Sequence, residues 1–382
     1  MRKIFFISLW VLIFSIGWEN LVLVSKIGTI SHALGLGTFF IAILAYCFYP
    51  LLRRPSIIHV LIICYLGWNA ISFLWSNYPA ISLRTLITQI QLFVLIWLIW
   101  QASQDNKSII ILEQAYITGL LISIVSLFIC YFKGVQSVYL RYSAVGFNAN
   151  DIAVAIALGI PLSWFLFLKF DKLILKIINL IVLLCSLAAI ILTGSRTGMI
   201  VGSIGFCYLL ITFFNTNKIE KVITILILLS CLAIIIFFIN SATFQRILSV
   251  KSELLHGTWG GRIIIWKMGI KQWFAHPLLG IGIGCYKQAV KWQGLLAASH
   301  NTFLQILVET GIIGFLLFMN INFLLFKKIV LLPSIEKKLF IIIFIIIFLG
   351  LSVLSWGLRK QLWIMYAFML GHIYNQKSQK ID

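Results

Sequence analysis

Apolar residues run along the chain in blocks of about 20, and short polar segments separate the blocks. The blocks are continuous rather than alternating, which predicts membrane-spanning helices and argues against membrane β-strands. The first block is longer than the apolar core of a signal peptide and lacks a clear cleavage site, so it is counted as a span. The pattern predicts an all-α polytopic membrane protein, one membrane domain over residues 1–382, with about twelve helices at 4–24, 33–52, 56–75, 85–101, 109–132, 151–168, 173–192, 199–214, 222–239, 302–326, 339–356 and 361–375.

Composition supports this fold class. Hydrophobic residues make up 62% of the chain and charged residues only 10%, whereas soluble domains average roughly 25% charged residues. The formal net charge is +20. Because the basic residues flank the apolar blocks, they indicate membrane topology and contact with anionic lipid head groups, and no nucleic acid partner is predicted.

Orientation follows from the distribution of these basic residues. If the N-terminus is cytoplasmic, 16 of the 30 Lys and Arg residues lie in cytoplasmic segments, seven in short outer loops and seven in residues 240–301. Long loops contribute little to this rule, so the count favours both termini inside. The segments 133–150, 193–198 and 240–301 then share the periplasmic face.

The segment 240–301 is predicted to be one large periplasmic loop that contains short interfacial helices. Residues 262–274 are apolar with two lysines, and Trp266 and Trp273 suit a helix that lies at the membrane surface. Pro277 should end this helix. The glycines that follow, at 280, 282 and 284, lack the Lys of a phosphate-binding loop and indicate a tight bend or a close backbone approach.

Three short motifs carry the candidate chemistry. Arg196 stands in GSRTG, where Gly194 and Gly198 allow a tight turn, and Arg262 follows two glycines at a helix start. Either arginine could be an ordinary membrane-edge residue, but a guanidinium also matches phosphate oxygens in a bidentate way. His300 precedes the 302–326 block, where the helix dipole favours a neutral imidazole. Taken alone, a solvated loop histidine is the simpler interpretation.

Several other residues could support such a site. Asn301, or Ser299, could cap the following helix, and Glu309 lies deep enough in that helix to need a partner, for example an arginine. Arg84 and Arg141 could widen a basic funnel toward an anionic substrate. The remaining polar candidates of the outer face are Asn148, Asn150, Asp151 and Tyr286.

No metal site and no cofactor are predicted. The outer face has no His, Cys, Asp or Glu cluster with metal-ligand spacing, and the seven cysteines form no C-x-x-C pair. The outer loops are poor in acids, which leaves paired-carboxylate glycosidase chemistry unsupported. No G-x-S-x-G motif is present.

The ordered set of motifs resembles the O-antigen ligase and O-antigen polymerase superfamily. GSRTG is followed by GR-x-x-x-W, then by HP-x-x-G-x-G-x-G and SHN-x-x-L-Q-x-L-x-E-x-G-x-x-G, with the strongest match over about 140–326. The resemblance implies a glycosyltransferase of the bacterial cytoplasmic (inner) membrane that works at its periplasmic face. Its donor would be a glycan linked to undecaprenyl diphosphate, which Arg196 and Arg262 would grip, and His300 would activate the acceptor hydroxyl.

Neither step requires a metal, and a single displacement would invert the anomeric centre. Transfer to lipid A–core, the ligase reaction, is favoured because all three motif residues of the ligase pattern are present. Transfer to a lipid-linked repeat unit, the polymerase reaction, uses the same donor chemistry and remains the alternative. A lipid-linked oligosaccharide flippase ranks below both, because the polar residues gather in outer loops and no matched broken helices appear.

Overall fold

The computed structural model describes residues 1–24, 28–48, 53–137, 140–239, 241–248, 259 and 261–378. Within these ranges the chain is helical apart from loops and two short hairpins. The helices are α1 (Arg2–Ile16), α2 (Ile30–Phe48), α3 (Ile57–Ile71), α4 (Pro79–Ala102), α5 (Asn106–Phe132), α6 (Ala149–Lys169), α7 (Leu173–Leu192), α8 (Arg196–Thr212), α9 (Lys218–Phe238), α10 (Ala242–Leu248), α12 (Arg262–Ala275), α13 (Tyr286–Ala289), α14 (Thr302–Ile329), α15 (Ser334–Val353) and α16 (Lys360–Ser378).

The two hairpins are antiparallel and lie in loops. Strands β1 (Leu23–Val24) and β2 (Gly28–Thr29) pair between α1 and α2. Strands β3 (Lys291–Trp292) and β4 (Leu295–Leu296) pair between α13 and α14. Strand content is therefore marginal in the described part of the chain, and the predicted all-α polytopic class is confirmed.

A helix lies at each of the twelve predicted spans. By length and composition, nine of the described helices could cross a membrane, namely α2 to α9 and α14. For α3 and α8 the span includes the 3-10 turn that follows the helix, so that the span of α8 runs from Arg196 to Asn215. The other three are α1, α15 and α16. Helix α1 is short, with 15 residues, and α15 opens with three charged residues, while α16 has many polar residues among its apolar ones.

Helix α6 forms the centre of the larger half of the molecule. Nearly all of its residues from Ala149 to Phe167 are buried, and α5, α7, α8 and α15 pack around it. Because it is apolar on every face, it can be covered completely by other helices. Helix α9, by contrast, is mostly exposed, as expected of a helix at the lipid-facing edge.

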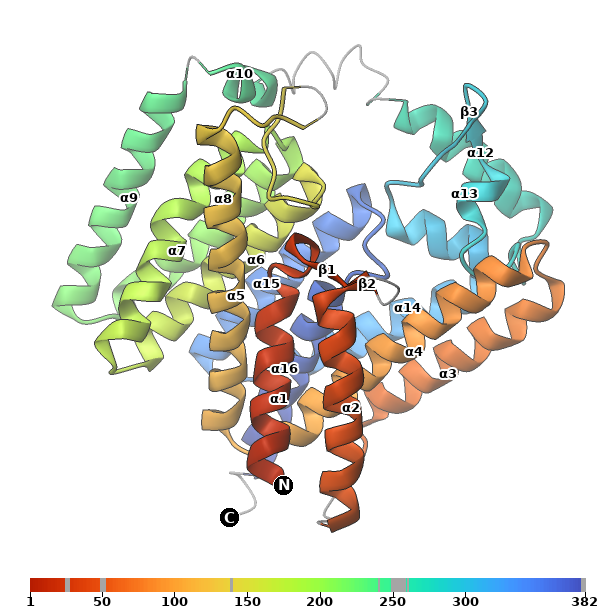
Figure 1. Cartoon of the computed structure of the whole chain (residues 1–382), viewed down its shortest axis with the longest axis horizontal. Coiled ribbons are helices and arrows are strands. Elements are labelled where there is room, and N and C mark those ends of the chain that lie inside the picture. The colour runs from red at the N-terminus through yellow and green to blue at the C-terminus, as the bar shows by residue number, and fades with distance from the viewer. Residues whose placement is uncertain are drawn as a thin grey trace.

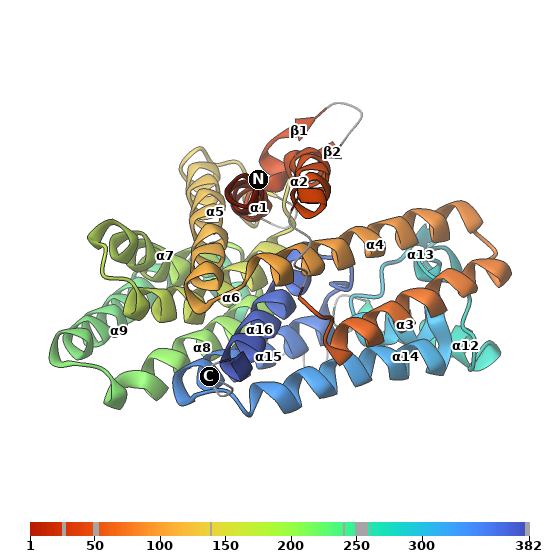
Figure 2. The same ribbon diagram turned by 90° about the horizontal axis from the view of Figure 1, so that it is seen from below.

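The second half is built on α3, α4 and α14, which run side by side and extend away from α1, α2 and α5 (Figure 2). Helices α12 and α13 and the β3–β4 hairpin pack near the N-terminal half of α14. Both chain ends lie at one end of the molecule, whereas α10, α12 and β3 lie toward the opposite end (Figure 1). The parts of segment 240–301 that are described thus gather away from the two termini.

Several polar side chains inside the helical core are paired with one another. His372 Nε2 of α16 lies 2.9 Å from Glu113 Oε1 of α5, and both side chains are buried. Trp164 Nε1 donates to Thr212 Oγ1 at 2.9 Å between α6 and α8. In an apolar surrounding an unpaired polar group is costly, so these pairs fix which helices face each other.

Candidate functional site

The GSRTG motif forms the start of α8. Ser195 is the N-cap, and its Oγ accepts a hydrogen bond from the Gly198 N–H at 3.1 Å. Gly194 turns the chain with φ 56°, a left-handed conformation that favours glycine. A Cβ at Gly198 would lie 2.5 Å from the Ala153 Cβ, so glycine lets α8 pack directly on α6. Arg196 is consequently the first residue of a helix, three residues earlier than the predicted span began.

Arg141 stabilises the turn between α7 and α8 through hydrogen bonds. Its Nε donates to the Thr193 carbonyl at 2.6 Å, and its Nη2 donates to Asn150 Oδ1 at 2.7 Å. The side chain is buried. These contacts give Arg141 a structural task in holding the α7–α8 turn against the start of α6, which the prediction of a substrate-binding arginine did not include.

Arg262 opens α12 in the same manner. Its predecessor Gly261 is the N-cap with φ 82°, and a Cβ there would lie 2.6 Å from the Trp292 ring. Gly260, the other glycine of the motif, lies outside the described residues. Burial lowers the pKa of the Arg262 guanidinium, and the positive charge of Arg196 lowers it further. The fold therefore brings two arginines from separate motifs close enough for their charges to interact.

His300 stands immediately before α14 in a left-handed conformation, φ 46°. Its N–H donates to Ser355 Oγ at 3.1 Å, and Asn301 is the N-cap, accepting from the Leu304 N–H at 3.0 Å. The indole of Trp266 donates to the Ser299 carbonyl at 2.8 Å. This bond joins α12 to residues 299–301, which are called the histidine turn below. Trp266 was predicted only as an anchor at the membrane surface, so this contact is an additional role.

Electrostatics link His300 to the arginine pair. Burial lowers the pKa of His300, the charge of Arg262 lowers it further, and Asp151 opposes the shift. A lowered pKa keeps the imidazole neutral to lower pH, as a general base requires. Arg196, Arg262 and His300 are each half-buried, so they share a partly dry environment that still opens to solvent.

Asp151 is the acid whose charge acts on His300. It lies in the first turn of α6 and accepts from Trp356 Nε1 at 2.9 Å, and it forms an ion pair with Arg359. Both partners belong to the α15–α16 loop, which also holds the histidine turn through Ser355. The signal in the sequence was a carboxylate at the start of a predicted span, on an outer face that is poor in acids.

Glu309 has partners other than the arginine that was suggested. Its Oε1 accepts from the Tyr286 N–H at 3.2 Å and from Gln305 Nε2 at 3.1 Å, and no ion pair with Glu309 occurs among the described residues. Backbone donors suffice because the glycine-rich segment runs close to α14. Glu309 is thus a buried support for the loop that leads to α13.

The glycines at 280, 282 and 284 make this close approach possible. All three have positive φ values, and a Cβ at Gly280 would lie 2.5 Å from the Glu309 backbone. The N–H groups of Ile281 and Gly282 donate to the carbonyls of Val308 and Glu309. Gly311 (φ 65°) breaks α14 at the same level. The predicted bend with close backbone approach is confirmed.

For Arg84, no contact with Arg196, Arg262 or His300 is seen in the described part of the chain. It lies on α4, which begins at Pro79 rather than at 85, because proline suits the first turn of a helix. Its side chain is exposed. In the described ranges, no three His, Cys, Asp or Glu side chains come close enough to hold a metal ion.

The fold and this cluster define a polytopic membrane protein with two arginines and a histidine brought together at helix starts near one end of the bundle. Residues 180–319 match the family model described as O-antigen ligase, which supports the similarity of this part of the chain to the O-antigen ligase and polymerase superfamily. The matched range contains Arg196, Arg262, His300 and Glu309. No curated protein matches the chain. The match supports a membrane glycan transferase of the ligase or polymerase type.

Proposed function

We propose that this protein transfers a glycan from a lipid-linked diphosphate, undecaprenyl diphosphate, to an acceptor hydroxyl at the periplasmic face of the bacterial inner membrane. The observation that carries the proposal is that Arg196, Arg262 and His300 stand at the starts of three helices, with Arg196 near enough for its charge to act on Arg262 and Arg262 near enough to act on His300. These residues come from three motifs that are far apart in the chain, and arginines at helix N-termini are suited to bind an anion.

Arg196 and Arg262 would bind the diphosphate. Guanidinium groups donate two parallel hydrogen bonds to phosphate oxygens, and each arginine here stands at the N-terminus of a helix, where anions are favoured. As the bond between the anomeric carbon and the diphosphate oxygen breaks, negative charge builds on the leaving group. Two fixed cations in a partly dry site stabilise that charge in the transition state.

His300 would act as the general base. The acceptor oxygen attacks the anomeric carbon, its proton passes to the neutral imidazole, and the lipid diphosphate departs with the electron pair of the broken bond. One displacement of this kind inverts the anomeric configuration. The lowered pKa of His300 supports this role because the free imidazole is available at neutral pH.

The orientation proposed is N-terminus and C-terminus in the cytoplasm. It is supported by the charge count and by the position of both termini at the end of the molecule opposite α10 and α12 (Figure 1). Lipid A–core is proposed as the acceptor, and residues 1–382 are proposed to form one membrane domain. The core of that domain would lie at about 140–326.

A deletion strain tests the proposal. Surface and lipid-linked glycans are separated on gels, with the wild-type gene, the His300→Gln gene or no gene supplied. Full-length polymer left on the lipid carrier, with bare lipid A–core, is the expected result without the gene. Lipid A–core that carries a single repeat would identify a polymerase instead, and unchanged glycan profiles in the deletion strain would refute both activities.

A further inference from the structure

A cavity of about 260 Å³ lies next to the turn that holds His300. Its walls come from α3, α4, the two parts of α14, the loop before α14 and the start of α16. Ser299 and Ser355 line it, and both flank His300: Ser299 precedes it, and Ser355 accepts a hydrogen bond from its N–H. Neither Arg196 nor Arg262 lines the cavity.

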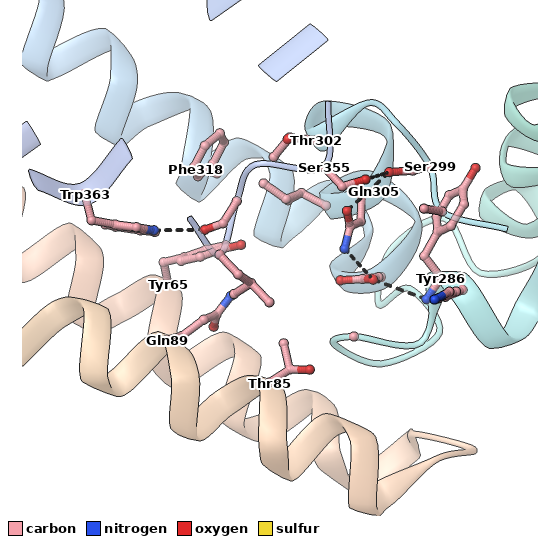
Figure 3. Close-up of a pocket in the computed structure, with 17 residues that line it drawn as sticks. Tyr65, Thr85, Gln89, Tyr286, Ser299, Thr302, Gln305, Phe318, Ser355 and Trp363 are labelled. Atoms are coloured by element: carbon pink, nitrogen blue, oxygen red, sulfur yellow. Dashed lines mark hydrogen bonds between the residues drawn. The ribbon is translucent and has the colours of Figure 1, made fainter. Parts of the chain in front are cut away.

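The two ends of the cavity differ in character (Figure 3). Ser299, Gln305 and the Tyr286 backbone lie at one end, next to the Glu309 carboxylate that both Gln305 and Tyr286 contact. Tyr65, Phe318 and Trp363 lie toward the other end, and Thr85 and Gln89 of α4 close the side between them.

This lining suits a neutral ligand that is rich in hydroxyl groups. Amide and hydroxyl groups can both donate to and accept from sugar hydroxyls, a carboxylate can accept from them, and aromatic faces pack against the apolar face of a ring. Lys287 is the one cation among the residues that line the cavity, which makes it a poor diphosphate site compared with the arginine pair. A sugar ring matches the mixed lining better than a phosphate or an acyl chain does.

We propose that this cavity binds a sugar of the acceptor glycan, and this inference rests on the proposed transferase function. The acceptor would lie with its bound sugar in the cavity, and its reacting hydroxyl would extend past Ser299 to His300. The diphosphate of the donor would be held on the opposite side by the two arginines. The histidine turn would thus separate the donor site from the acceptor site.

Two threonines of α4 provide a matched test. Thr85 Oγ1 donates to the Ile81 carbonyl at 2.9 Å, and Thr88 Oγ1 donates to the Arg84 carbonyl at 3.0 Å. Their helical contacts are equivalent, but only Thr85 lines the cavity. Thr85→Val should raise the acceptor KM about 3- to 10-fold, the effect of one lost hydrogen bond, while Thr88→Val should leave it unchanged.

A second variant fills the cavity without deleting a hydrogen bond. Ala298 lies in the loop before α14 and lines the cavity, so Ala298→Val and then Ala298→Leu should raise the acceptor KM progressively. The full-length protein is assayed in detergent with a labelled lipid-linked donor, and with lipid A–core or a lipid-linked repeat unit as acceptor. The donor KM and kcat should stay within about 2-fold of wild type.

The inference is overturned if Thr85→Val and Ala298→Leu behave like Thr88→Val, or if they raise the donor KM instead. Binding of labelled core oligosaccharide to the protein without donor gives a separate readout. Transfer by wild type to neither acceptor would refute the proposed function. In that case, equal oligosaccharide binding by wild type and Ala298→Leu would reject the cavity as a sugar site as well.

Discussion

Replacing Gly198 by alanine should misplace Arg196 through a single methyl group. The added Cβ would lie 2.5 Å from the Ala153 Cβ and 3.1 Å from the Ser195 Cβ, whereas carbon atoms in contact normally lie about 3.5–4.0 Å apart. Helices α6 and α8 must therefore separate by roughly 1 Å at this level. Overpacking of this kind costs about 1–3 kcal/mol, from which the better helix propensity of alanine subtracts up to about 1 kcal/mol.

Activity should fall more than stability does. Arg196 lies two residues from the clash, and a misplacement of about 1 Å in a positioned group can reduce the rate on the order of 100-fold. Transfer from a labelled lipid-linked donor measures the rate, and thermal unfolding in detergent measures the stability. Gly37→Ala is the matched control, because a Cβ there meets no atom within 4 Å.

The cause can be isolated with Ala153→Gly. This change removes the atom that the new methyl group meets, so the double variant Gly198→Ala/Ala153→Gly should recover most of the lost activity. The double-mutant cycle should give a favourable coupling energy of about 1–3 kcal/mol. A fully active Gly198→Ala protein, or a double variant no better than the single one, would refute the packing argument.

Three further predictions concern the site itself. Arg196→Gln and Arg262→Gln should each lower kcat/KM for the donor about 100-fold or more while the protein still inserts into the membrane. Lys133→Gln, at an exposed lysine, is the control, and near-normal transfer by either arginine variant would contradict diphosphate binding by this pair. His300→Gln should lower kcat at least about 100-fold. In the wild type, the acid limb of the pH profile of kcat/KM should have its midpoint below about pH 6.5, because burial and Arg262 lower the pKa of His300, and a midpoint above 6.5 would argue against the assignment. Arg262→Gln should move that midpoint upward in any residual activity. Asn301→Ala should destabilise the protein by about 1 kcal/mol in thermal unfolding and Asn301→Asp by less, since the side chain caps α14, whereas equal stability of both variants would exclude that role.

Local sequence signals located most of the elements correctly. The N-cap at Asn301, the end of α12 before Pro277 and the bend at the glycine-rich segment all follow from short-range rules, because caps, prolines and glycines act on their own backbone. Two boundaries that differed, at Pro79 and Arg196, lie where a polar first turn hides a helix from a hydropathy pattern. The predicted span 4–24 was too long, since α1 ends at Ile16 and a 3-10 turn and strand β1 follow it. Hydropathy reports burial in lipid, not the start of the helical backbone.

The hydrogen-bond partners of individual side chains could not be predicted from these short-range rules. Arg141 was expected to meet a substrate, but the fold turns it inward to the Thr193 carbonyl and Asn150. Glu309 was expected to need a partner, with an arginine as one example, and the fold supplies a backbone donor instead, because Gly280, a position where only glycine fits, lets the chain approach α14 closely. Such outcomes depend on which surfaces of distant helices meet.

By itself, the sequence determined the membrane-embedded helical class and singled out the three motif residues, because apolar length and short motifs are properties of the chain itself. Only the tertiary structure decided that the charges of Arg196, Arg262 and Asp151 act within one cluster with His300, and that a cavity with polar and aromatic walls lies next to the turn that holds His300. Interactions between side chains weaken steeply with distance, and the distances between residues far apart in the chain exist only once the helices have packed.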